Sequence, residues 1–416
     1  MNIYIKKIKT ITSQSKVFEN YFFMTILKLL STLIGMALYP YLIRTLGIKP
    51  FGEYIFAQSI ISLFTIFVSF GLDLPNTKKI VENKEDVSIK SFIVSGVFTS
   101  KVYLFCISII LFFLLLLILR DRLISPLVFI ICFSQITSEI LFPIWYFQAV
   151  QKMKIVTYLQ LSCRLATIPF ILILVKTPED LWVYACIISL SVILGGLMSL
   201  YIILKNEKIQ LRFIKYYFLK DFFKEAVPFF WSNCIGTVKE HSATIIIGVF
   251  LGMNEVAVYD LAKKIIVIPR MLTVNINSAL FPKIIQDNNK TKIKKIIKIE
   301  TYIGLVIIMF IMIFGYWIVL FLGGKSMILS YPVSIILSIT IISWLIVGAF
   351  INFIFIPQGY FYLITWNQIV AFFSFILACS LLFIYNSIVV VSIALAFSGI
   401  CEIVFCKYLI KKLRLR

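Results

Sequence analysis

The chain has 416 residues, of which 61% are hydrophobic and only 14% are charged. This composition excludes a soluble globular domain, because there are too few polar side chains to cover a surface in contact with water. The formal net charge of +21 does not indicate a nucleic-acid partner, since the basic residues alternate with long apolar stretches instead of gathering in one domain.

Apolar stretches long enough to cross a bilayer recur along the whole chain. A helix of about 20 residues spans a hydrocarbon core of about 30 Å. We therefore predict an all-α integral membrane protein with about twelve transmembrane helices, at residues 19–41, 51–74, 91–119, 123–150, 155–175, 180–204, 226–250, 256–282, 299–322, 330–356, 361–385 and 387–410. The first stretch is too long for a signal peptide and lacks a cleavage pattern, so it should remain as a helix.

The distribution of Lys and Arg predicts the topology. Basic residues are concentrated at 78–90, 205–224, 283–298 and after 406, whereas the intervening loops are short and nearly uncharged. Because cytoplasmic loops carry the excess of Lys and Arg, these segments and both termini should face the cytoplasm.

An internal repeat appears when the chain is compared with itself at an offset of 205 residues. LGIKPFGEYIFAQSII at 46–61 aligns with LGMNEVAVYDLAKKII at 251–266, each at a junction between two predicted helices. Because six helices separate the copies, they should have the same topology, as in transporters made of two parallel, pseudo-symmetric bundles. We predict bundles at 1–204 and 226–416, joined by a basic, aromatic cytoplasmic segment at 205–225 that either forms an interfacial linker helix or is a solvated connector.

Charged side chains lie within several predicted spans, although a charge at mid-bilayer costs about 3 kcal/mol on insertion scales. On the first helix Lys28 shares a face with small and polar residues, and on the seventh helix Glu240 shares such a face with Asn233, the repeat equivalent of Lys28. The eighth helix is the most polar, with one face that carries Asp260, Lys263, Lys264, Arg270, Asn275, Asn277 and Ser278. We expect this face to line a watery cavity.

Six cations should form a ladder across the membrane. The predicted topology places Lys28 and Arg164 in the cytoplasmic half, Lys239 and Arg270 near the middle, and Lys263 and Lys264 in the outer half. Such a ladder suits an anionic head group, because phosphate oxygens can pass between Lys and Arg without full desolvation. The structural alternative is that these cations pair with carboxylates or carbonyls at helix contacts, or extend to the interface from positions close to helix ends.

Local spacing predicts how some of these charges are neutralised. Asp260 and Lys264 are four residues apart on one helix and could pair. Arg164 and Glu139 could neutralise each other across helices, and Lys101, near the start of its helix, should extend to the interface.

Coupling to an H⁺ or Na⁺ gradient has four candidate residues, namely Glu139, Glu240, His241 and Asp260. His241 is the only histidine, so a proton relay is one interpretation and a packed side chain the other. No motif for covalent catalysis or nucleotide binding is present, and the cysteines lie in apolar spans without metal-ligand spacing. We therefore expect no enzymatic chemistry, no cofactor and no metal site.

Five segments, taken in order, carry a family resemblance: RTLGIKPFGEYIFAQS (44–59), PIWYFQAVQKMK (143–154), AVPFFWSN (226–233), LGMNEVAVYDLAKKI (251–265) and ALFPKI (279–284). With them the chain resembles bacterial O-antigen flippases of the Wzx type, within the larger group that also holds multidrug and toxin extrusion proteins and lipid II flippases. The resemblance implies two six-helix bundles around a central cationic cavity. It also implies alternating access that carries an undecaprenyl diphosphate-linked oligosaccharide across the bacterial inner membrane, for O-antigen, lipopolysaccharide or other surface polysaccharide.

The implied partners are the lipid-linked oligosaccharide, membrane lipids, and polysaccharide polymerase and chain-length proteins. An ion-coupled multidrug antiporter is the main alternative, which Lys28 disfavours and Glu240 favours. A glycan polymerase or ligase is disfavoured by the short outside loops, and the signature of the major facilitator class is absent between the second and third helices, where the chain reads GLDLPNTKKIVENK.

Overall fold

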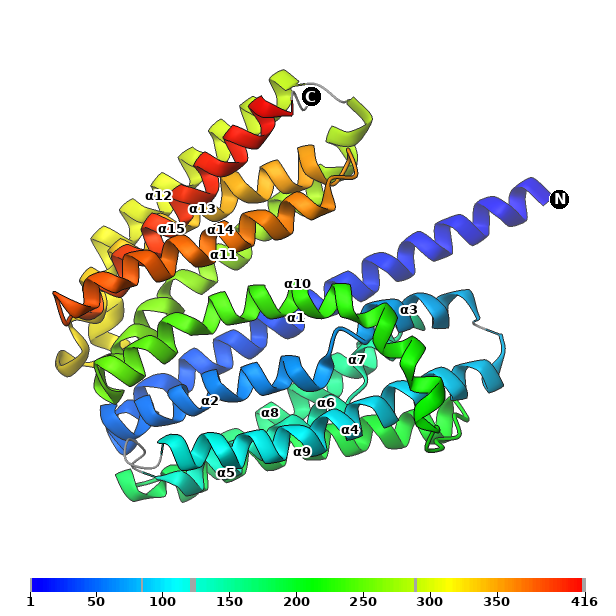
Figure 1. Ribbon diagram of the computed structural model, residues 1–416, viewed down its shortest axis with the longest axis horizontal. Helices are drawn as coiled ribbons and strands as arrows, with labels where there is room; N and C mark the ends of the chain where they lie inside the picture. Colours follow the sequence, from blue (N-terminus) through cyan, green and yellow to red (C-terminus); the bar gives the residue numbers. More distant parts are fainter. Residues whose placement is uncertain (1, 84, 120–124, 288–289, 414–416) are drawn as a thin grey trace. The chain divides into compact units, whose positions relative to one another are not determined.

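The computed structural model describes the backbone of residues 2–83, 85–119, 125–287 and 290–413, and the side chains of these residues except 2–18, 20, 21, 271–287, 290–292, 294 and 361. Within these ranges the regular elements are all helical (Figure 1). The α-helices are α1 (Asn2–Leu46), α2 (Ile48–Ser69), α3 (Asp73–Glu82), α4 (Val87–Leu119), α5 (Pro126–Phe133), α6 (Ser138–Leu141), α7 (Ile144–Ala149), α8 (Met153–Leu174), α9 (Leu181–Asn206), α10 (Tyr216–Phe250), α11 (Met253–Asp287), α12 (Lys290–Gly323), α13 (Ser330–Phe350), α14 (Phe361–Cys379) and α15 (Ile388–Lys412).

Ten segments of the described chain are long and apolar enough to cross a membrane. They correspond to ten of the predicted spans, and the other two fall in α10 and α11. These two helices have 35 residues each, which is ample length for a bilayer at about 1.5 Å per residue. Charged side chains lower the hydropathy of α10 and α11, and these two helices carry most of the candidate residues.

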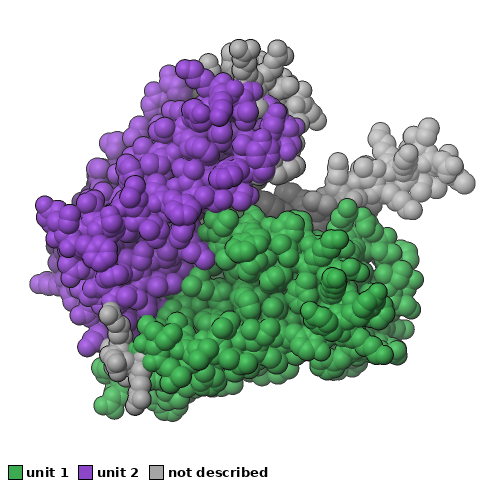
Figure 2. Space-filling view, in the orientation of Figure 1, with its two compact units in different colours: residues 1–38, 57–237 green, residues 39–56, 238–416 purple. Residues whose placement is uncertain are grey.

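The chain forms two compact units, which Figure 2 shows in different colours. Unit 1 comprises residues 1–38 and 57–237, and unit 2 comprises residues 39–56 and 238–416. In unit 1, α9 packs against α5, α6 and α8, and α3 packs against α7. In unit 2, α13 packs against α11, α12 and α15, and α14 packs against α15. The predicted division into residues 1–204, 205–225 and 226–416 follows bundles of transmembrane helices and stays a prediction.

The two copies of the internal repeat have the same local structure. Gly47 follows α1 and Gly252 precedes α11, and both have left-handed backbones, with φ of 82° and 119°. Their amides donate to Ile43 O at 3.1 Å and Ile247 O at 3.0 Å, which closes the preceding helix. Glycine adopts this conformation without the strain a Cβ would bring, so the Leu-Gly pair of each repeat marks a sharp turn between two helices.

The fourth predicted span is not one continuous helix. After α5 a 3₁₀ turn covers Ser134–Thr137, α6 follows, and α7 begins only after a break at Phe142 and Pro143. Proline lacks an N–H and disfavours a helical conformation in the residue before it, and Phe142 accordingly leaves the helical region, at φ −115° and ψ 78°. The prediction of a single helix over 123–150 is therefore wrong in this detail.

The segment 205–225, expected as a linker helix or connector, is helical only at its two ends. Between α9 and α10 the chain runs along α4 and is held by hydroxyl groups one turn apart. Ser91 Oγ accepts from Gln210 N–H at 3.1 Å, Ser95 Oγ donates to Gln210 O at 3.2 Å, and Thr99 Oγ1 accepts from Ile214 N–H at 3.2 Å. Side-chain hydroxyls thus supply the hydrogen bonds that a helix would otherwise make within itself.

Candidate functional site

Two of the predicted cations lie close together in unit 1. Arg164, on α8, donates from Nη1 to the carbonyl oxygen of Ser31 at 3.2 Å, and Ser31 is one turn of α1 beyond Lys28. Both side chains are exposed. Within the described residues no carboxylate lies at ion-pair distance from either Lys28 or Arg164, so this part of unit 1 carries uncompensated positive charge.

The predicted pairing of Arg164 with Glu139 is wrong, because Glu139 forms an ion pair with Lys101 instead. Lys101 Nζ lies 2.9 Å from Asp73 Oδ1 and 3.6 Å from Glu139 Oε2. Lys101 is 2% exposed, so the expectation that it extends to the interface is also wrong. Its buried ammonium requires partners, since an unpaired charge in an apolar interior is very costly.

The break in the fourth span explains why the Lys101 side chain points into the interior of unit 1. It donates a hydrogen bond to the backbone carbonyl of Glu139 at 3.1 Å, on the short helix α6 that ends before Pro143. A carbonyl released from the helical pattern needs another donor at membrane depth. Lys101 therefore connects α4, the start of α3 and the broken helix in one polar cluster around its buried ammonium.

In unit 2 Lys239, on α10, pairs with Glu402, on α15. Asn367 of α14 is fully buried and donates from Nδ2 to Glu402 Oε2 at 3.4 Å, while Cys406 Sγ donates to Asn367 Oδ1 at 3.4 Å. The side chains of Lys239 and Glu402 are only 20% and 11% exposed. This cluster joins three helices of unit 2 through one ion pair and two further polar contacts.

The polar face of α11 carries two further ion pairs. Lys264 Nζ lies 2.6 Å from Asp260 Oδ2, which confirms the predicted pairing, and 4.4 Å from the centre of the Tyr39 ring. Lys263 Nζ lies 3.6 Å from Glu240 Oε1, on α10. The Glu240 side chain is 59% exposed, which makes it the most accessible acid among the four coupling candidates.

Arg270 and His241 have different surroundings. The Arg270 guanidinium lies 4.5 Å from the centre of the Trp344 ring of α13, a cation–π arrangement. His241 Nδ1 is buried with no hydrogen-bond partner among the described residues. The side chains of Asn275, Asn277 and Ser278, predicted on the same face as Arg270, lie outside the described residues.

Sequence reasoning missed three polar residues that the structure places in these clusters, namely Asp73, Asn367 and Glu402. Glu402 is the only acid in the predicted span 387–410 and Lys101 the only charge in 91–119. A charge within an apolar span usually has a partner inside the protein, so the sequence could have indicated that Glu402 and Lys101 each belong to an ion pair.

The arrangement divides the predicted ladder into two kinds of cation. Lys239, Lys263 and Lys264 each face a carboxylate in unit 2, and Arg270 stacks on an aromatic ring. Lys28 and Arg164 face no carboxylate in the described chain. For an anionic head group these two are the cations already available, whereas the paired lysines become available only if their ion pairs open.

These features define a multi-pass membrane transporter fold. The chain is similar to the lipid II flippase MurJ in its inward closed conformation, with a TM-score of 0.76 and 13% identity over 94% of this chain and 87% of that one. It is also similar to a multidrug resistance MATE family transporter of the MOP superfamily in its inward-facing conformation, with a TM-score of 0.64 and 13% identity over 92% of this chain and 99% of that one.

Residues 17–287 match the family model described as "Polysaccharide biosynthesis protein", and the chain belongs to that family. A protein of Escherichia coli (strain K12), named as a proposed O-antigen transporter, is 24% identical over 70% of this chain and 70% of its own length. One of Shigella dysenteriae with the same name is 27% identical over 59% of this chain and 61% of its own length. The predicted family and fold class are confirmed.

Proposed function

We propose that the protein carries an oligosaccharide repeat unit, linked to undecaprenyl diphosphate, from the cytoplasmic to the periplasmic face of a bacterial inner membrane. Transport would proceed by alternating access and would supply O-antigen or another surface polysaccharide. The polymerase and chain-length proteins that use such units are its proposed partners. Both termini lie in the cytoplasm in this proposal, as the distribution of Lys and Arg predicts.

The observation that carries this proposal is that Lys28 and Arg164, on two membrane-spanning helices, face no carboxylate in the described part of the chain. A cation within the bilayer is costly and is kept where it meets an anion or water. The diphosphate of a lipid-linked sugar is such an anion, and Arg binds phosphate oxygens through paired N–H groups. A transporter of cationic drugs would meet electrostatic repulsion at this place.

The second candidate function is ion-coupled antiport of a small molecule. It is favoured by the exposed carboxylate of Glu240, which could bind a cation when its contact with Lys263 opens. In the first proposal Glu240, His241, Asp260 and Glu139 are instead candidates for coupling transport of the lipid-linked sugar to an H⁺ or Na⁺ gradient.

The test is a strain that lacks the gene and carries plasmid copies of the wild type, Lys28→Ala, Arg164→Ala or Lys154→Ala. Lys154 is an exposed lysine on α8, the helix that also carries Arg164, and serves as the matched control. The assay measures surface polysaccharide and the amount of lipid-linked unit on each face of the inner membrane. We expect the unit to remain on the cytoplasmic face in the first two variants and to cross normally with Lys154→Ala. Normal translocation in the strain without the gene would disprove the proposal.

A further inference from the structure

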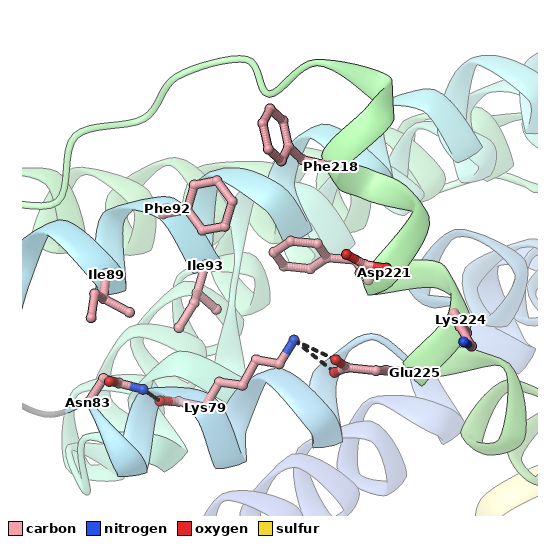
Figure 3. A pocket seen from close by; sticks show the side chains of 10 residues that line it. Lys79, Asn83, Ile89, Phe92, Ile93, Phe218, Asp221, Lys224 and Glu225 are labelled. Atoms are coloured by element: carbon pink, nitrogen blue, oxygen red, sulfur yellow. Dashed lines mark hydrogen bonds and ion pairs between the residues drawn. The ribbon is translucent and has the colours of Figure 1, made fainter.

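Unit 1 contains a cavity of about 740 Å³ that is separate from the charged clusters described above. It lies between α3, the beginning of α4 and the beginning of α10 (Figure 3). Its volume is within the range of roughly 300–1,000 Å³ typical of small-molecule sites.

One wall of the cavity is apolar. Phe92, on α4, makes ring contacts with Phe218 and Phe222, on α10, with centroid distances of 6.4 and 6.1 Å. Phe222 is 4% exposed and belongs to the core of unit 1, whereas Phe92 and Phe218 are 47% and 50% exposed. The exposed rings therefore offer an apolar surface that the protein itself does not cover.

The rest of the lining includes two cations and two acids. Lys79 and Glu225 form an ion pair at 2.8 Å (Figure 3). Lys79 Nζ also lies 5.1 Å from the centre of the Phe222 ring. Asp221 and Lys224, three residues apart on α10, make no ion pair with any described residue. The cavity thus retains one carboxylate and one ammonium for a ligand.

The position of the cavity along the chain places it at the level of lipid headgroups. Tyr216 and Tyr217, at the start of α10, are 73% and 82% exposed. Aromatic residues of this kind, beside a basic segment at the end of a membrane span, are typical of the membrane–water interface. The basic segment 205–224 predicts that this is the cytoplasmic interface.

We propose that this cavity binds the headgroup of a membrane aminophospholipid, of the phosphoethanolamine class. The lipid ammonium would donate hydrogen bonds to Asp221, the phosphate would accept from Lys224, and the first acyl carbons would lie on Phe92 and Phe218. A phosphoglycerol headgroup would offer Asp221 only neutral hydroxyl groups and no cation to neutralise the carboxylate, and a choline headgroup has no N–H to donate. The lining therefore favours a zwitterionic headgroup with a primary amine. This lipid site is separate from the transport proposed above and does not depend on which cargo is carried.

Native mass spectrometry of the purified full-length protein in detergent can test this proposal. The protein is titrated separately with dioleoyl phosphatidylethanolamine, phosphatidylcholine and phosphatidylglycerol. The variant Asp221→Asn/Lys224→Gln removes both free charges and leaves the net charge unchanged. The matched control, Lys78→Gln/Glu82→Gln, removes an exposed ion pair from α3 outside the cavity. A second variant, Phe218→Ala, tests the apolar wall through a residue that is half exposed.

We expect the wild type and the α3 control to bind phosphatidylethanolamine more tightly than the other two lipids. The Asp221→Asn/Lys224→Gln variant should lose roughly fivefold in affinity for phosphatidylethanolamine, as expected for two partly exposed charge contacts, and should lose the preference among the lipids. Phe218→Ala should weaken the binding of all three lipids by the same factor. Equal binding of the three lipids by the wild type, a preference for phosphatidylglycerol, or an unchanged preference in the Asp221→Asn/Lys224→Gln variant would overturn the proposal.

Discussion

The ion pair between Lys239 and Glu402 gives the sharpest prediction about unit 2. In Glu402→Gln the side chain keeps its shape and its contact with Asn367, but the ammonium of Lys239 loses its counter-charge. Removing one partner of a buried ion pair costs about 3–5 kcal/mol. Lys239 is one-fifth exposed, so some solvation is recovered and we expect the lower end of that range, about 3 kcal/mol.

The double variant Lys239→Met/Glu402→Gln separates the cost of a stranded charge from the loss of the pair itself. Methionine fills the volume of the lysine stem without a charge. Because replacing a buried ion pair by apolar groups is often neutral, the double variant should recover most of the lost stability. Glu402→Gln, Lys239→Met and the double variant, compared with the wild type, form a double-mutant cycle that gives the interaction free energy of the pair.

The assay is reversible unfolding in mixed micelles, followed by circular dichroism, together with export in cells. If Glu402→Gln is as stable as the wild type, or if the double variant is less stable than Glu402→Gln, the argument that this pair holds α10 to α15 is refuted. Export by the stable double variant decides the role of Lys239 in transport. Normal export would make the pair structural, and lost export would support the predicted place of Lys239 in the ladder.

Three other changes follow from the packing of each unit. Lys101→Met should lower the free energy of unfolding by at most about 3 kcal/mol, because it leaves Asp73 and Glu139, which are 40% and 29% exposed, without their shared cation. Unchanged stability in the same micelle assay would contradict this. Gly52→Ala should sharply reduce the yield of folded protein, since a Cβ at this position would lie 1.8 Å from the carbonyl oxygen of Met253. Size-exclusion chromatography after detergent extraction measures this yield. A normal monodisperse peak would be evidence against the close approach of Gly52 to Met253. Ser95→Ala removes a hydroxyl that holds the extended segment at 209–214, at a cost of about 1 kcal/mol. Proteolysis of that segment should therefore become faster. An unchanged cleavage rate would show that the hydroxyl is not needed to hold the segment.

The sequence predicted features within single helices well, but it did not predict contacts between helices. The spans, the junctions at Gly47 and Gly252 and the pair of Asp260 with Lys264 were predictable, because each depends on residues close together in the chain. The pairing of Arg164 with Glu139 was wrong although both were rightly placed on membrane-spanning helices, since the choice of partner depends on how neighbouring helices are rotated and at what depth they meet.

The sequence by itself therefore determined that the chain is helical and membrane-spanning, which segments cross the bilayer and which helix faces are polar. Hydropathy and the helical period are sufficient for this, because the bilayer requires every spanning segment to satisfy its own backbone. Only the tertiary structure decided which charges neutralise each other. Glu402 lies 163 residues from Lys239, and no local pattern relates them. The contacts of Lys101 with Asp73 and Glu139 likewise join residues 28 and 38 positions apart. They occupy the acid that the sequence analysis assigned to Arg164, so Lys28 and Arg164 remain cations without a carboxylate in the described chain.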